Sequence, residues 1–124
     1  MEQERPLGSS LEHKLQIDDQ TTISDIIDGT KVVETRLFDK KRKEYKVGDY
    51  LLFSYGSITI KKKITDIVWY PSLRKMIEAE SLEAIFPSLS CSMTLDDALK
   101  KYYGKFGFSK EVEEKDGCVA ISFS

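Results

Sequence analysis

The chain has 124 residues, of which 40% are hydrophobic, 10% aromatic and 32% charged, as is typical of one folded, water-soluble domain rather than a disordered or fibrous protein. No apolar run is long enough to cross a bilayer and the N-terminus lacks the apolar core of a signal peptide, so we expect a cytoplasmic or nuclear protein with no membrane partner. Cys91, Cys118 and the single His13 lack the spacing of a zinc site, so we expect reduced thiols and no metal or cofactor.

The formal net charge of −2 hides an uneven distribution along the chain. Residues 1–28 hold two basic and seven acidic side chains, residues 29–75 hold twelve and five, and residues 76–124 hold five and nine. The middle segment therefore carries +7 between flanks of −5 and −4. Such a basic segment favours contact with phosphate, although the run Lys40–Lys43 is also typical of a solvated turn.

The N-terminal residues 1–11 contain Pro6, Gly8 and paired serines without periodicity, which predicts a flexible arm. We expect residues 12–124 to form a single domain. Within it, His13–Ile17 alternates between polar and apolar residues and is predicted to be the first strand.

The next predicted element is a short helix over Thr21–Asp28. Its isoleucines recur at helical spacing, either Thr21 or Thr22 is a candidate N-cap, and Gly29 follows where a helix often ends. A second strand is predicted over Lys31–Leu37. Its alternation places Val32, Glu34 and Arg36 on one face and Val33, Thr35 and Leu37 on the other.

A β-hairpin is predicted after the charged turn Asp39–Glu44. Its first strand is Tyr50–Ser54, and its second is the long strand Ile58–Trp69. The apolar alternation of this second strand changes parity at Ile67, which indicates a β-bulge. Lys62 lies in the inward register before that change, so it either faces a cleft or, as we favour, accompanies the bulge.

The remaining chain is predicted to form short helices and one closing strand. One or two short helices are expected over Ser72–Glu80 and the apolar segment Leu82–Phe86, and a variant capping-box sequence begins the clearest helix, Thr94–Tyr103. Ser109–Lys115 fits either a helical turn or a polar strand, whereas Cys118–Phe123 is predicted to be a buried strand. Strands around segregated short helices predict an α+β fold, a small mixed β-barrel with helices packed around it.

Two motifs resemble the signature of the ASCH domain family. These are the string Gly29-Thr-Lys31-Val-Val-Glu34-Thr-Arg36 and the turn Val47-Gly48-Asp49, which precede the expected Thr94–Tyr103 helix and the apolar closing strand. The resemblance covers roughly residues 13–123. It implies a PUA-like barrel and a cleft between the barrel and its helices that accepts RNA or a modified nucleoside.

Lys31, Glu34 and Arg36 are the predicted ligand contacts in that cleft. Arg36 offers a planar fork to phosphate or a base edge, Lys31 supplies a point charge and Glu34 accepts from a base amine. The alternative is that Glu34 and Arg36 only form an ion pair that stabilises the barrel. Tyr70 and Tyr103 are further candidates, because they could stack on an unpaired base.

The resemblance also implies an enzymatic alternative, because some bacterial ASCH proteins resemble nucleoside amidohydrolases that use a lysine, a threonine three residues later and a distant glutamate. Lys31 matches the lysine and is the candidate catalytic residue, whereas Glu34 replaces the threonine and the glutamate position falls near Cys91; the spacing does not favour Glu83 as a substitute. Catalysis would require a lowered pKa at Lys31. A nucleoside amidohydrolase or ribonuclease is thus one alternative function, and a protein-interaction module that uses the N-terminal arm or the acidic tail is another.

Overall fold

The computed structural model describes residues 8–124, so the first seven residues of the predicted arm lie outside the described part. The strands are β1 (Glu12–Gln16), β2 (Val33–Leu37), β3 (Tyr50–Tyr55), β4 (Ile58–Tyr70) and β5 (Cys118–Phe123). The helices are α1 (Gln20–Ile27), α2 (Leu73–Glu80), α3 (Leu82–Ile85), α4 (Leu95–Tyr103) and α5 (Lys110–Asp116), with 3-10 turns η1 (Arg42–Glu44) and η2 (Ser90–Ser92). This arrangement confirms the predicted α+β fold.

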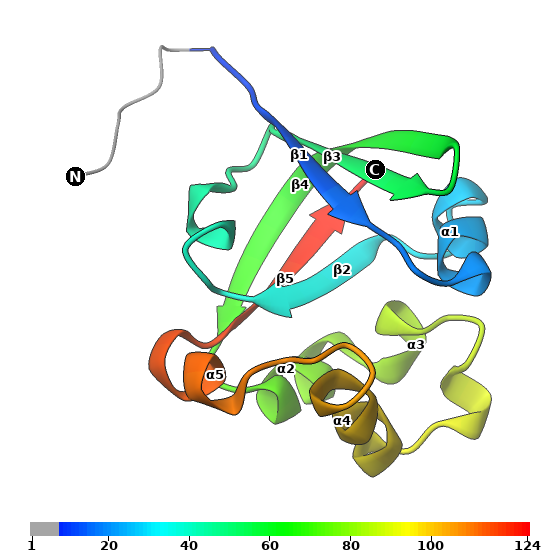
Figure 1. Ribbon diagram of the computed structural model, residues 1–124, viewed down its shortest axis with the longest axis vertical. Helices are drawn as coiled ribbons and strands as arrows, with labels where there is room; N and C mark the ends of the chain where they lie inside the picture. The colour runs from blue at the N-terminus through cyan, green and yellow to red at the C-terminus, as the bar shows by residue number, and fades with distance from the viewer. Residues whose placement is uncertain (1–7) are drawn as a thin grey trace.

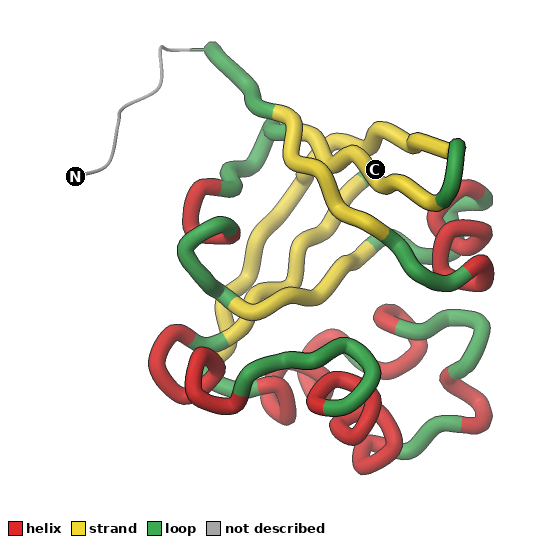
Figure 2. Tube along the Cα trace, viewed as in Figure 1, coloured by secondary structure: helices red, strands yellow, loops and turns green. Residues whose placement is uncertain are grey.

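The five strands form one curled sheet in the order β1-β3-β4-β5-β2 (Figure 1). β1 and β3 pair in parallel, whereas the other neighbouring pairs are antiparallel. β1 and β2 follow one another in sequence but occupy the two edges of the sheet. The barrel is consequently open between these two edge strands, and helices α2 to α5 form a separate layer beside the sheet (Figure 2).

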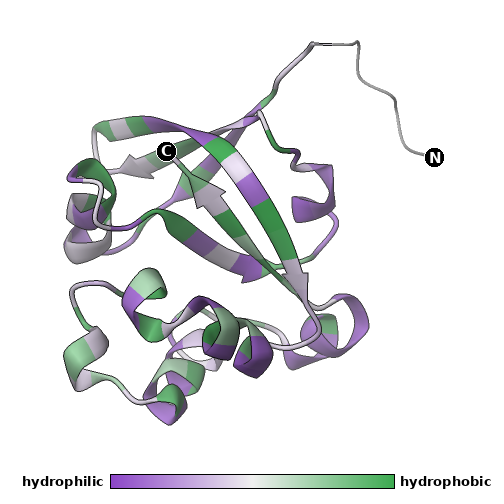
Figure 3. Cartoon of the chain, turned by 180° about the vertical axis from the view of Figure 1, so that it is seen from behind, coloured by the Kyte–Doolittle hydropathy of each residue, from purple (hydrophilic) through white to green (hydrophobic). Residues whose placement is uncertain are grey.

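The predicted bulge in β4 is confirmed. The pairing of β4 with β5 shifts register between Ile64 and Asp66, so Ile64 faces the barrel interior before the shift and Ile67, opposite Ile121, faces it afterwards. Hydrophobic and hydrophilic stretches both occur along this long strand in Figure 3. Lys62 is half-buried on the same sheet face as its partner Leu51.

Two hydrophobic cores lie on the two faces of the sheet. The first fills the barrel and includes Leu51, Phe53 and Ile121, and α1 closes it with Ile23 and Ile26. The second lies between the outer face of β5 and β2 and the helix layer. It contains Val33, Leu73, Met76, Ile77, Ile85, Ala98, Tyr102, Cys118 and Ala120.

Most predicted element boundaries agree with the structure, but the start of α1 differs. Asp19 caps this helix by accepting from the backbone N–H groups of Thr21 and Thr22, so the prediction of a threonine cap was wrong. Asp19 is the N-cap instead of a threonine because its carboxylate accepts hydrogen bonds from both N–H groups at once. The predicted capping box is confirmed at Thr94 and Asp97, and the ambiguous Ser109–Lys115 segment is helical as α5.

A buried carboxylate, Asp49, holds the start of β1 against the turn before β3. Asp49 is 1% exposed, and it accepts from the backbone N–H of Leu11 at 3.1 Å and of Lys46 at 3.1 Å. Asp49 Oδ2 also lies 2.7 Å from His13 Nε2, and the His13 ring stacks on Tyr45 with 4.0 Å between the ring centroids. The Val-Gly-Asp turn therefore serves as a clamp on the first strand.

Candidate functional site

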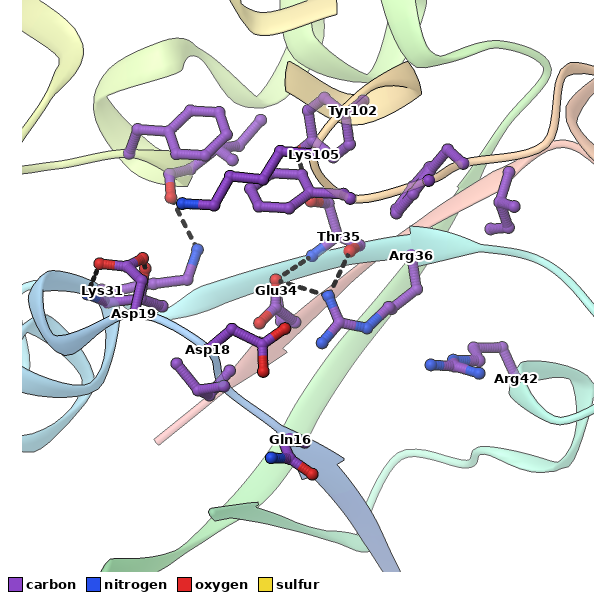
Figure 4. Close-up of a pocket in the computed structure, with 18 of the residues that line it drawn as sticks. Gln16, Asp18, Asp19, Lys31, Glu34, Thr35, Arg36, Arg42, Tyr102 and Lys105 are labelled. Atoms are coloured by element: carbon purple, nitrogen blue, oxygen red, sulfur yellow. Dashed lines mark hydrogen bonds and ion pairs between the residues drawn. The ribbon is translucent and has the colours of Figure 1, made fainter. Parts of the chain in front are cut away.

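A cavity of about 350 Å³ opens between the two unpaired edges of the barrel (Figure 4). The end of β1 and the start of α1 form one wall, β2 and the turn after it form the floor, and α3 with the loop after α4 forms the opposite wall. The lining consists of Gln16, Ile17, Asp18, Asp19, Thr22, Lys31, Glu34, Thr35, Arg36, Leu37, Asp39, Arg42, Ile85, Phe86, Tyr102, Lys105, Phe106, Gly107 and Phe108. Lys31, Glu34 and Arg36, the predicted ligand contacts, all line it.

The edge of β2 that faces the cavity is closed by its own side chains. The backbone N–H of Thr35 donates to Glu34 Oε1 at 2.9 Å, and its carbonyl accepts from Arg36 Nη1 at 3.1 Å. An unpaired strand edge would otherwise offer free backbone groups to another chain. Glu34 and Arg36 thus protect this edge, while the Thr35 hydroxyl on the other face is hydrogen-bonded to Tyr102.

Glu34 is a buried carboxylate beside two cations. It is 6% exposed, and its Oε1 lies 3.4 Å from Arg36 Nη1. Burial raises the pKa of Glu34, but Arg36 and Lys31, together with the Thr35 N–H, outweigh burial and hold the pKa below its ordinary value. Oε2 has no hydrogen-bond partner among residues 8–124, and Glu34 is one of the residues that line the cavity.

Lys31 is more deeply buried than Glu34, with 4% of its surface exposed. Its Nζ donates to the carbonyl of Ile85 at 2.6 Å, which ties the segment just before β2 to the end of α3. Burial lowers the pKa of Lys31, Glu34 opposes that shift and Arg36 adds to it, so the net pKa lies below the ordinary value. Lys31 therefore combines a structural tether with an ammonium group held beside the cavity.

Two further cations line the cavity, and the sequence motif does not contain them. Arg42, in η1, lies 3.4 Å from Asp39 Oδ2 through Nη1. Lys105 extends from the loop after α4 along the cavity (Figure 4). Burial raises the pKa of Asp19, but hydrogen bonds from Thr22 and Thr21, with a smaller contribution from the charge of Lys105, hold it below its ordinary value. Within the described chain, Lys105 forms no ion pair.

Aromatic side chains form the wall on the helix side. Phe106 is 41% exposed and stacks on Phe86, with centroids 6.4 Å apart and planes 16° apart. Tyr102 is buried behind them, where burial raises the pKa of its hydroxyl. Gly104 and Gly107 flank Lys105 and Phe106, so the sequence predicts a loop there, but only the fold brings that loop to β2.

Tyr70 and Tyr103, the other predicted ligand contacts, do not line the cavity. The hydroxyl of Tyr70 donates to Glu80, which raises its pKa to about 12, and the hydroxyl of Tyr103 donates to Glu113. Lys62, Glu83 and Cys91 also lie outside the cavity lining. The structure thus gathers the three charged residues of the motif and separates the two tyrosines from them.

No group of three or more His, Cys, Asp or Glu side chains in residues 8–124 is placed to hold a metal ion. Among the helices described, none is long and apolar enough to cross a membrane. Of the two cysteines, Cys91 is exposed and Cys118 buried, and both are free thiols.

Comparison with known proteins supports the resemblance drawn from the motifs. The crystal structure of hypothetical protein PH0355 has a TM-score of 0.75 and 32% identity, covering 94% of this chain and 98% of that one. The solution NMR structure of protein PF0455 from Pyrococcus furiosus has a TM-score of 0.71 and 30% identity, covering 91% and 96%. No curated protein sequence matches the chain. The family model of the ASCH domain matches residues 19–124, and the chain belongs to the ASCH domain family.

Proposed function

We propose that this domain binds single-stranded RNA by taking one unpaired or modified nucleotide into the cavity. Membership in the ASCH family supports the general statement of an RNA-binding-like domain. The observation that carries the finer proposal is the carboxylate of Glu34, which is buried beside the cations of Lys31 and Arg36 and keeps Oε2 without a partner in the described chain. Such a group selects a ligand that offers N–H donors.

Each side chain of the motif has a separate role in this proposal. Glu34 Oε2 accepts from an amine on the base edge, as carboxylates do from cytosine. Arg36 commits Nη1 to Thr35 and Glu34, and its other N–H groups donate to a base carbonyl or a phosphate. Lys31 keeps Glu34 ionised from its buried position. Phe106 offers the stacking face that Tyr70 and Tyr103 do not supply at this cavity.

The size of the cavity agrees with a single nucleoside. Sites for small ligands usually enclose about 300 to 1,000 Å³, and this cavity of about 350 Å³ lies at the lower end of that range. The cavity is lined by four cations and four carboxylates, so its charges balance. The cations are Lys31, Arg36, Arg42 and Lys105, and the carboxylates are Asp18, Asp19, Glu34 and Asp39. Asp19 accepts hydrogen bonds, and Glu34 and Asp39 lie beside arginines. The cavity is therefore suited to a polar base more than to a multiply charged anion.

Fluorescence anisotropy with a labelled single-stranded 12-nucleotide RNA tests the proposal. We expect Arg36→Ala to weaken binding about tenfold or more, since a bidentate base contact contributes about 1 to 3 kcal/mol. Arg74→Ala is the matched control, because Arg74 is an exposed arginine on α2, 4.0 Å from Asp96. Equal affinities for Arg36→Ala and Arg74→Ala would remove the site assignment.

A second candidate function is hydrolysis of an acylated nucleoside or of RNA, and the lowered pKa of Lys31 favours it. A lysine of this kind is a potential base or nucleophile. Incubation of acylated nucleosides and RNA with the protein, with and without divalent metal, measures turnover directly. Turnover that Lys31→Ala abolishes would support hydrolysis, whereas turnover equal to that of Lys31→Ala would exclude it for those substrates.

A further inference from the structure

A row of lysines lies on the outer face of strands β1, β3 and β4. In the pairing of these strands, Lys14 lies opposite Leu52 and Leu52 lies opposite Lys61. In the adjacent row, Tyr50 lies opposite Lys63. Residues opposite one another in a sheet point to the same face, and Lys14, Lys61 and Lys63 are all exposed. We call the surface formed by these three lysines the lysine face.

The charge on the lysine face is only partly balanced. Lys61 Nζ lies 2.6 Å from Glu12 Oε2 and 4.4 Å from the centroid of the Tyr50 ring. The side chains of Lys14 and Lys63 form no ion pair within residues 8–124. Three lysines and one glutamate leave a local charge of +2. In contrast, Lys43 of the basic turn is paired with Asp116 at 2.9 Å.

The lysine face adjoins the cavity through β1. Gln16 lines the cavity, and it projects to the same side of β1 as Lys14, because the two residues are two positions apart on a strand. At the strand rise, their Cα atoms are about 7 Å apart, and Lys61 lies about 10 Å from Lys14 across two strand spacings. A chain that leaves the cavity past Gln16 therefore reaches the three lysines within a few nucleotides.

We propose that the lysine face binds the phosphodiester backbone of the RNA strand whose unpaired nucleotide occupies the cavity. This inference rests on the proposed function. Lysines contact phosphates as point charges without reading sequence, which suits a surface that follows a strand. The half-buried ring of Tyr50 lies among these cations, and single-strand binders combine aromatic rings with a positive surface in this way.

The test compares two probes, a labelled 12-nucleotide single-stranded RNA and cytidine monophosphate. The variant is the triple change Lys14→Gln, Lys61→Gln and Lys63→Gln. The matched control is Lys75→Gln, Lys100→Gln and Lys115→Gln, which removes three exposed lysines from α2, α4 and α5. Thermal denaturation establishes that both triple variants fold, since exposed lysines contribute little to stability.

We expect the lysine-face variant to bind the 12-nucleotide RNA about tenfold more weakly, with cytidine monophosphate binding, measured by NMR shifts, unchanged. Its salt dependence should also fall by about 2 in log–log slope, because each phosphate contact on a single strand contributes about 0.7. The control variant should retain most of its affinity and slope. An acidic polypeptide that competes as well as RNA would overturn the assignment to RNA.

The outcomes separate this inference from the cavity proposal. Unchanged RNA affinity in the lysine-face variant, or an equal loss in the control variant, would overturn the lysine face and leave the cavity proposal standing. In a second outcome, the lysine-face variant loses RNA affinity while Arg36→Ala binds both probes normally. That result would support backbone binding by the lysine face and overturn the proposal that the cavity binds a nucleotide. Weaker binding of the mononucleotide by the lysine-face variant would also contradict a role confined to the backbone.

Discussion

Asp49 and Glu34 are both buried carboxylates in motifs of the ASCH signature, but their surroundings differ. Asp49 uses both oxygens inside the protein, through Leu11 and Lys46 backbone groups and His13. Glu34 has its described contacts on Oε1 and is one of the residues that line a cavity. Burial of a charged group therefore does not by itself indicate function. The useful distinction is whether the hydrogen-bonding capacity of the group is consumed by the fold.

The largest expected effect is on stability, from Asp49→Ala. This change leaves two backbone N–H groups and His13 without their acceptor, so the free energy of unfolding should fall by about 3 kcal/mol or more. Urea denaturation measures the change, with Glu78→Ala on the exposed face of α2 as a control that should change stability by less than about 0.5 kcal/mol. RNA affinity of the folded fraction should stay within twofold. A stable Asp49→Ala protein that loses RNA affinity would reverse the comparison.

The second effect is on binding, from Glu34→Gln. Glutamine keeps an acceptor for the Thr35 N–H but loses the negative charge that attracts base amines and neutralises Arg36 and Lys31. We expect RNA affinity to fall about tenfold, equivalent to 1.4 kcal/mol, and the free energy of unfolding to fall by about 1 kcal/mol. Anisotropy and urea denaturation of the same preparation measure both. A loss of stability without a loss of RNA affinity would mean that Glu34, like Asp49, stabilises the fold and does not bind RNA.

The smallest effect is on the pH dependence of stability. Because the pKa of Glu34 in the folded protein is below the ordinary value of 4.5, the folded state binds the proton less tightly than the unfolded state. The stabilisation from Glu34 is therefore present above about pH 4.5 and is lost as the pH falls toward the folded pKa. The difference in unfolding free energy between wild type and Glu34→Gln should shrink in that window. A constant difference from pH 7 to pH 3 would contradict the lowered pKa.

Sequence patterns predicted the parts of the fold that depend on local chemistry. The alternation of β4 located the bulge, because a change of parity within a strand requires an extra residue. Thr94 and Asp97 predicted the start of α4, since their mutual hydrogen bonds involve residues only three apart. The shared face of Glu34 and Arg36 followed from the strand period, and their ion pair is present in the structure.

Sequence patterns did not predict features that depend on distant segments. Lys31 bonds to Ile85, 54 residues away, and Lys105 and Phe106 reach the cavity from the loop after α4. Tyr70 appeared suitable for stacking because aromatic residues are common in RNA sites, but its hydroxyl is hydrogen-bonded to Glu80 in the helix layer. Contacts of this kind are set by packing rather than by a local pattern.

The irregularity in β4 also has a consequence for how this protein tolerates changes in length. One strand serves both hydrophobic cores, and the added residue decides which side chains each core receives. Deletion of Thr65 would remove this extra residue and leave Ile67 facing the barrel and Tyr70 facing the helices. The strand should therefore tolerate the loss of Thr65 better than the loss of Val68, which would turn Tyr70 toward the barrel.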